Sequence, residues 1–366
     1  MATTVNRAEF LVLLETAQPG LSTKDVFEQS SCFVFTGGWL VTFNGEISCR
    51  VKTGLPPEFE GAVDAAPLLA SLAKLTEETV DLAIAGGELQ VTGAKKAVGV
   101  RLQAEILLPV DSVDRPGAWV DLPEDFSAAV EIVQETVGRD KDQFMTLVIH
   151  VHPRWLESCD RFQATRYKIR CGNTEPFLVR QASLKHVVRY GMHRMSETEN
   201  WVHFKNKSGL IYSVRRFVED YPDMTAFFSV AGTPTVLPKS AESAADLCAV
   251  FSGDDRDDDK VGVELSPGRL RVTGRGSAGW ARQDLEMPGY KGEPTAFRIS
   301  PKLLATVVQK YAECEIARDL TKLKATGERW AYITALAPVD GKAAAPPRAE
   351  PDDAGDDEGQ DESGDF

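Results

Sequence analysis

The stretch LLASLAKLTEETVDLAIAGGELQVTG, from Leu68 to Gly93, carries the clearest structural pattern in the chain. Its first eight residues place apolar side chains at helical spacing. The residues that follow alternate apolar and polar side chains on both sides of a Gly-Gly turn. The stretch therefore predicts an amphipathic helix followed by two antiparallel strands.

The same pattern returns twice along the chain. Three octets align without gaps: LLASLAKL (68–75), SLKHVVRY (183–190) and LLATVVQK (303–310). Their apolar positions lie 115 and 120 residues apart, and each octet is followed by strand-like sequence. Chance similarity is the alternative, because any α+β protein has several amphipathic elements. The near-equal spacing favours an internal repeat.

Each third of the chain also begins with another helix candidate, at residues 7–18, 123–136 and 238–251. The second and third candidates begin with Pro after Leu, and proline is favoured at the first helical position. The segment GRLRVTG (268–274) echoes GELQVTG (87–93), which suggests that each third consists of two similar halves. We therefore predict an α+β protein with three similar tandem domains, at residues 1–118, 119–232 and 233–340.

The composition indicates a soluble globular protein. Of the 366 residues, 43% are hydrophobic and 26% are charged, which is enough to bury two or three cores. The N-terminus lacks the pattern of a secretory signal, and no run approaches the roughly 18 apolar residues of a membrane span. The six cysteines are scattered and form no CxxC pair. We expect reduced thiols and a cytoplasmic location.

The net charge of −14 is concentrated at the C-terminus. Residues 349–366 contain nine acidic residues and no basic one, and without these nine the chain has 46 acidic residues against 41 basic ones. Residues 341–366 are rich in Ala, Pro, Gly and acid, so we predict a disordered acidic tail. Whether this tail recruits a partner is left open.

Four segments resemble the bacterial-type DNA polymerase III β subunit (DNA sliding clamp) family: SCDRFQAT (158–165), SVRRFVEDYPDM (213–224), FRISPKLLATVVQKY (297–311) and WAYITALAPV (330–339). The resemblance covers about residues 5–339 and rests on the order and spacing of these segments. Departures such as Ser158-Cys159 and Glu219-Asp220-Tyr221-Pro222 suggest a divergent member. A viral (bacteriophage) source is one candidate.

The resemblance implies a ring. In this family each domain has two inner helices and outer antiparallel sheets, and two three-domain chains close a six-domain ring around double-stranded DNA. The chain would then be a homodimeric, non-enzymatic processivity factor that tethers the replicative DNA polymerase and needs a clamp loader. It would use no cofactor and act in the cytoplasm, or in the host cytoplasm if it is viral.

A sliding ring should contact phosphates loosely and read no bases, because base contacts would hold it at one sequence. We expect basic residues on the predicted helices and beside them to face the DNA. These are Lys24, Lys74, Lys185, His186, Arg189, Arg194, Lys239, Lys302 and Lys310. Lys24 is included because it matches a basic position of the family's channel rim. Ordinary solvated helix faces are the alternative. The helix candidate at 123–136 fits poorly, because it carries acids and no base.

The family also binds short apolar peptides of polymerases and loaders in a cleft between its second and third domains. The matching positions in this sequence are Cys159, Phe162, Ala164, Ser229, Val236, Ile333 and Ala335. Small or apolar lining residues suit a groove that buries peptide anchors. The alternative is that these are plain core residues of strands.

No catalytic constellation and no metal site is predicted. His150 and His152 lie on one face of a strand but lack further ligands at suitable spacing, and GDDRDDDK (253–260) lacks the glycine and final glutamate of a calcium loop. Two other functions remain as alternatives to the replication clamp: a clamp-like tether for transcription or repair factors, and a repeated-domain structural assembly protein.

Overall fold

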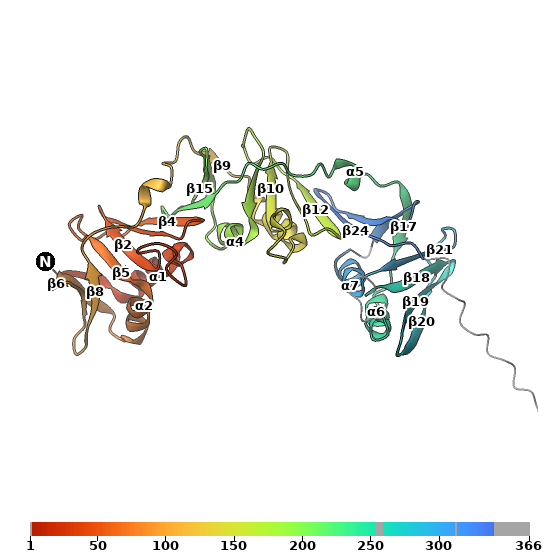
Figure 1. The fold of residues 1–366 in the computed structure, drawn as a ribbon, viewed down its shortest axis with the longest axis horizontal. Helices are drawn as coiled ribbons and strands as arrows, with labels where there is room; N and C mark the ends of the chain where they lie inside the picture. Colours follow the sequence, from red (N-terminus) through yellow and green to blue (C-terminus); the bar gives the residue numbers. More distant parts are fainter. Residues whose placement is uncertain (1, 253–258, 312, 340–366) are drawn as a thin grey trace, which may run out of the picture. The chain divides into compact units, whose positions relative to one another are not determined.

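The structure is a computed structural model that describes residues 2–252, 259–311 and 313–339. It divides into two compact units, Met1–Lys239 with Ala305–Ala335, and Ser240–Leu304 with Leu336–Phe366. Antiparallel sheets with helices packed on them build both units, which confirms the predicted α+β class (Figure 1). The predicted acidic tail, residues 341–366, lies outside the described residues.

A single order of elements recurs along the described residues. One strand, one helix and three strands form a repeat that occurs six times between β1 and β24, with α5 inserted after the fourth (Figure 1). The helices are α1 (Arg7–Ala17), α2 (Ala65–Lys74), α3 (Phe126–Val133), α4 (Gln181–Arg189), α5 (Thr225–Phe228), α6 (Ala241–Ala249) and α7 (Pro301–Lys310). Helices α1, α3 and α6 lie within the predicted helices at 7–18, 123–136 and 238–251. Helices α2, α4 and α7 overlap the predicted octets but begin two or three residues earlier, and α5 was not predicted.

Two prolines do not occupy the positions predicted for them. Pro123 and Pro238 were expected at the first position of a helix, but α3 begins at Phe126 and α6 at Ala241. In the first case the chain makes a turn before the helix, in which the backbone N–H of Phe126 donates to the carbonyl of Pro123 at 3.0 Å. Pro123 therefore starts the turn that precedes α3, and Pro238 lies just before the turn at residues 239–240 that precedes α6.

The larger unit contains a 12-stranded sheet. Its strands, in spatial order, are β1 (Thr3–Asn6), β6 (Thr79–Ala85), β7 (Glu88–Thr92), β8 (Ala97–Gln103), β5 (Gly61–Asp64), β2 (Cys32–Thr36), β3 (Trp39–Phe43), β4 (Ile47–Lys52), β16 (Ile211–Arg215), β15 (Trp201–Lys205), β14 (Arg194–Glu197) and β9 (Val120–Asp121). Alternate residues of these strands form a core with the apolar faces of α1 to α4. Arg7 links α1 to α2, because its guanidinium donates to the carbonyls of Leu72 at 3.2 Å and Glu77 at 2.9 Å.

The same unit contains an eight-stranded sheet. Its strands, in spatial order, are β13 (Phe177–Arg180), β10 (Val148–His152), β11 (Trp155–Cys159), β12 (Gln163–Lys168), β24 (Trp330–Ala335), β23 (Lys322–Thr326), β22 (Glu313–Ala317) and β17 (Gly232–Val236). Two antiparallel pairs, β4 with β16 and β12 with β24, join strands from distant repeats. Each of these four strands is the last strand of its repeat.

The smaller unit contains a four-stranded sheet in the order β20 (Gly279–Met287), β19 (Gly268–Gly276), β18 (Val261–Ser266) and β21 (Thr295–Ile299). Small side chains let α6 pack closely on this sheet, because Ala241, Ala244, Ala245 and Cys248 are all buried. At Gly274 in β19, an added Cβ would lie 1.8 Å from the carbonyl oxygen of Cys248. Glycine at this position is therefore required by the packing of the helix.

Acid is expected to destabilise the larger unit through His203 in β15. The imidazole is fully buried, and its Nδ1 lies 2.7 Å from the hydroxyl of Ser213. Burial lowers the pKa of His203 from 6.5 to about 4, although Asp114 opposes this shift. The unfolded chain therefore binds the proton better below about pH 6.5, and the free energy of unfolding should fall by about 2 kcal/mol by about pH 5. Urea denaturation at two pH values measures this loss, and a variant with His203→Gln should lose less. An equal loss in both proteins would contradict the assignment.

Candidate functional site

With one exception, the residues predicted to face DNA lie on or beside the helices to which the sequence analysis assigned them. Lys74 is in the last turn of α2, Lys185 and Arg189 are on α4, and Lys302 and Lys310 are on α7; all five are exposed. Lys24 lies in the loop after α1 and Lys239 in the turn before α6, and both are exposed. The exception is Arg194, which was predicted on a helix but begins strand β14. The chain leaves α4 at Arg189, five residues earlier.

Neighbouring residues reduce the positive charge that three of these basic groups can offer to DNA. Arg194 forms an ion pair with Asp121 at 2.9 Å, and Lys310 forms one with Glu135 at 2.5 Å. His186 lies on α4 between Lys185 and Arg189, and burial followed by these two cations lowers its pKa to about 4. His186 is therefore neutral near pH 7. The cations on α4 are Lys185 and Arg189.

The acids around α3 have basic partners in the last repeat. Glu135, just after α3, pairs with Lys310, and the carboxylate of Asp125, just before it, accepts from Arg329 at 2.5 Å and from the Tyr167 hydroxyl at 3.1 Å. These contacts offset part of the negative charge that made this helix a poor fit to a DNA-facing surface.

Five of the seven predicted cleft residues come together at the β12–β24 junction. Ala164 in β12 is directly opposite Ile333 in β24 and Cys159 in β11. The N–H of Ala335 donates to the carbonyl of Phe162 at 2.7 Å. Ala164 and Ile333 are fully buried, whereas Phe162 is 52% exposed.

The linker around α5 covers these residues. Phe228 packs on Ala164 and Ile333, and Met224, Phe227 and Val230 pack at the edge of the same cluster. Ser229 lies between Phe228 and Val230 and is exposed. Sequence reasoning missed the apolar linker residues, although the spacing of Met224, Phe227 and Phe228 is that of one helical face.

Val236 is not part of this cluster. It ends β17, the edge strand of the eight-stranded sheet, and its backbone partner is Glu313. Two strands, β22 and β23, separate β17 from β24. The side chain of Val236 is 58% exposed.

Two cations hold the linker in place. The ammonium of Lys322 donates to the carbonyls of Ala226 and Phe227, both at 3.3 Å, and lies 5.4 Å from the Phe227 ring centre. The guanidinium carbon of Arg166 lies 4.7 Å from the ring centre of Phe228. These contacts fix a helix of only four residues, which would be unstable alone.

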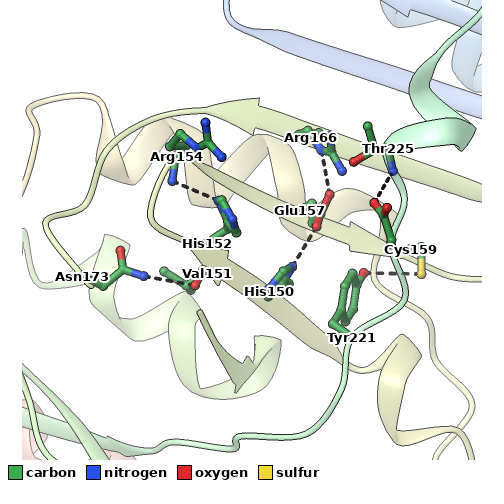
Figure 2. Close-up of polar contacts among 11 residues, drawn as sticks. His150, Val151, His152, Arg154, Glu157, Cys159, Arg166, Asn173, Tyr221 and Thr225 are labelled. Carbon is green, nitrogen blue, oxygen red and sulfur yellow. Dashed lines mark hydrogen bonds and ion pairs between the residues drawn. The ribbon is translucent and has the colours of Figure 1, made fainter. Parts of the chain in front are cut away.

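A buried polar network supports Arg166 from below (Figure 2). The carboxylate of Glu157 lies 2.7 Å from Arg166 Nε and 2.7 Å from His150 Nδ1. Burial raises the pKa of Glu157, but the contacts with His150 and Arg166 outweigh it, so the net pKa is lowered and the carboxylate stays ionised. The hydroxyl of Tyr221 donates to the sulfur of Cys159 at 3.4 Å, which ties the linker to the end of β11.

These contacts give His150, His152 and Cys159 structural roles that need no metal and no catalysis. His152 stacks on Trp155 with ring centres 3.5 Å apart, and His150 is bound to Glu157. Burial raises the pKa of the Cys159 thiol, so the reactive thiolate is disfavoured. Within the described ranges, no three His, Cys, Asp or Glu side chains gather as metal ligands would. Most of the acidic loop at 253–260 lies outside the described residues.

Every helix that the structure describes is too short or too polar to span a bilayer.

No family model and no curated protein matches the sequence. Solved structures do match it. The DNA polymerase III β subunit of Thermotoga maritima is 16% identical with a TM-score of 0.76, over 92% of this chain and 99% of that one.

Two further structures agree. A Pseudomonas aeruginosa sliding clamp (DNA polymerase III subunit β) bound to griselimycin is 13% identical with a TM-score of 0.78, over 93% of this chain and 100% of that one. The β subunit from DNA polymerase of Streptococcus pyogenes is 14% identical with a TM-score of 0.77, over the same shares. Likeness at these identities establishes the fold, and this chain has the fold of DNA polymerase III β subunits.

Proposed function

We propose that the chain is a DNA sliding clamp, a non-enzymatic processivity factor that encircles double-stranded DNA as a homodimer. In this proposal it tethers a replicative DNA polymerase and is placed on DNA by a clamp loader in the cytoplasm. The observation that carries the proposal is the likeness to sliding clamps over 92% of the chain or more. The division into domains at 1–118, 119–232 and 233–340 is part of the proposal, and each domain would contain two repeats.

The sheet edges support the homodimer. Each of the six repeats ends in a strand. Four of these final strands pair with each other, β4 with β16 and β12 with β24, so β8 and β20 are the two final strands without such a pairing in the described residues. In the described residues β20 pairs with β19 alone, and β8 pairs along its length with β7 but with β5 at Leu102 and Gln103 only. We propose that β20 of one chain pairs antiparallel with β8 of a second chain. Two such junctions would close a ring instead of extending into a filament.

Light scattering on a sizing column tests this dimer. Twice the chain mass of 40.0 kDa is expected. A trimer or an open polymer would contradict the pairing of β8 with β20 in a two-chain ring and would favour a structural assembly protein. A pull-down that identifies the proteins bound to the chain would distinguish a replication clamp from a clamp that tethers transcription or repair factors.

The exposed cations of α4 should contribute to DNA binding without reading sequence. Replacing Lys185 and Arg189 with Gln removes two phosphate contacts, so the slope of log affinity against log salt should become less steep by about 2. Fluorescence anisotropy with duplexes of two unrelated sequences measures this, and both sequences should respond alike. The control is Lys95→Gln with Lys96→Gln, which removes two exposed cations from the turn between β7 and β8. Equal effects of the two variants would contradict the role of α4.

The cluster at the β12–β24 junction is the proposed peptide site. Phe162 offers exposed apolar surface beside a buried floor of Ala164 and Ile333. Phe162→Ala should therefore weaken retention of the replicative polymerase on immobilised clamp about tenfold, the usual effect of losing a moderate anchor. Val218→Ala is the control, because Val218 is 70% exposed and lies outside the cluster. Unchanged retention with Phe162→Ala would remove Phe162 from the site.

A further inference from the structure

Cations and tryptophans gather on the face of the 12-stranded sheet that α1 and α2 do not cover. In β4, Cys49 and Val51 belong to the core beneath the helices, so Arg50 and Lys52 point to the opposite face. Lys205 in β15 lies on that face too, because Arg50 and Lys205 are both paired with Ile211 of β16. We call the following residues the basic–aromatic patch: Trp39, Arg50, Lys52, Arg115, Trp119 and Lys205.

The tryptophans of the patch are already stacked with its cations. Arg50 and Lys52 lie 5.4 and 5.5 Å from the ring centre of Trp39, and Lys205 lies 5.8 Å from that of Trp119. The rings therefore hold cationic groups in place by cation–π attraction. Rings engaged in this way are poor platforms for stacking nucleobases, so the patch is suited to anionic groups and not to single-stranded nucleic acid.

The cations of the patch lack anionic partners. Within the described part of the chain, none of Arg50, Lys52, Arg115 and Lys205 forms an ion pair, whereas the neighbouring Arg194 is neutralised by Asp121. Arg50 Nε is buried and has no acceptor among the described residues. Burial and the charge of Arg115 lower the pKa of Arg50. A carboxylate bound beside Arg50 and Arg115 would offset the repulsion between these two like charges.

The chain supplies a segment of matching charge. Residues 349–366 have nine acidic side chains and no basic one. From Asp340 to Phe366 the chain can extend about 90 Å, at about 3.4 Å per residue. A tethered segment of this length that spans the distance to its site has an effective concentration of up to the millimolar range, so weak exposed ion pairs would then be enough for docking.

We propose that the acidic C-terminal segment of this chain, residues 349–366, docks on the basic–aromatic patch. Its carboxylates pair with Arg50, Lys52, Arg115 and Lys205. This docking does not depend on the proposed clamp function, because none of the predicted DNA-facing or cleft residues belongs to the basic–aromatic patch. It explains why a chain with net charge −14 leaves this group of cations unneutralised.

Zero-length carbodiimide cross-linking of the full chain, read by mass spectrometry, tests the docking. Tail carboxylates should cross-link to Lys52 and Lys205 about fivefold more than to the exposed control lysines Lys95, Lys96 and Lys141, and the excess should vanish at about 0.5 M salt. Tail cross-links that spread evenly over these lysines, or that avoid Lys52 and Lys205, would overturn the proposal.

A matched pair of full-length variants separates docking from general attraction. Arg50→Gln with Arg115→Gln removes two cations of the patch but keeps Lys52 and Lys205 as reporters, and cross-linking to them should fall about fivefold. Lys95→Gln with Lys96→Gln makes the same change in net charge elsewhere and should leave it unchanged. An equal fall in both variants would overturn the proposal, and circular dichroism checks that both variants fold.

Discussion

A chain carrying Leu247→Asp and Trp280→Asp is expected to run as a monomer at concentrations where the unaltered chain is a dimer. Trp280 lies on β20 and is 59% exposed, and Leu247 lies on α6, which packs on β19 and β20, and is 49% exposed. In the proposed dimer these apolar side chains are buried beside the β8–β20 pairing. Placing two carboxylates there should weaken association at least about 100-fold, or about 2.7 kcal/mol.

Sedimentation across a dilution series measures this association. The control is Val26→Asp, because Val26 is 67% exposed but lies in the loop after α1. It should leave the dimer intact. Loss of the dimer in the control as well, or none in the double variant, would move the interface away from β20.

Arg166→Ala is expected to destabilise the larger unit more than the loss of an exposed cation would. Arg166 is 14% exposed and pairs with Glu157, which is 3% exposed, so its removal leaves a buried carboxylate with His150 as its remaining partner. Breaking a buried pair in this way costs about 3–5 kcal/mol. The variant also loses the contact between Arg166 and Phe228, which should loosen the linker over the proposed peptide site.

Urea denaturation followed by circular dichroism measures the cost. Adding Glu157→Gln to Arg166→Ala should recover much of it, because the unpaired charge is then gone. Arg269→Ala serves as the control, since Arg269 is 50% exposed and lies 3.9 Å from Asp284; a change of less than about 1 kcal/mol is expected. Similar costs for the two arginines would show that Glu157 is not held as described.

The helices were predictable because their apolar residues recur at helical spacing. Leu184 and Val187 of α4 are buried as that spacing requires. The echo between GELQVTG and GRLRVTG was also informative, because β7 and β19 occupy the same position in their repeats. Helix α5 was not predicted because four residues show too little periodicity. Arg194 was wrongly assigned to a helix because the end of α4 is set by local geometry.

The sheet junctions could not be predicted from the residues alone. The pairing of Ala164 with Ile333 joins residues far apart in sequence, and no local pattern encodes it. Resemblance to a known family placed these residues together, but not the linker above them. Phe228 covers Ala164 and Ile333 because Arg166 and Lys322 fix its path, and these contacts depend on the tertiary structure.

Retention on circular DNA tests the encirclement of DNA most directly. Concentrating a dilute, dissociated chain in the presence of closed circular duplex would assemble rings around it without a loader. Gel filtration in high salt should then show protein that stays with the circle and is released after a single cut in the DNA. A protein that dimerises but leaves the intact circle as readily as the cut one would contradict the clamp.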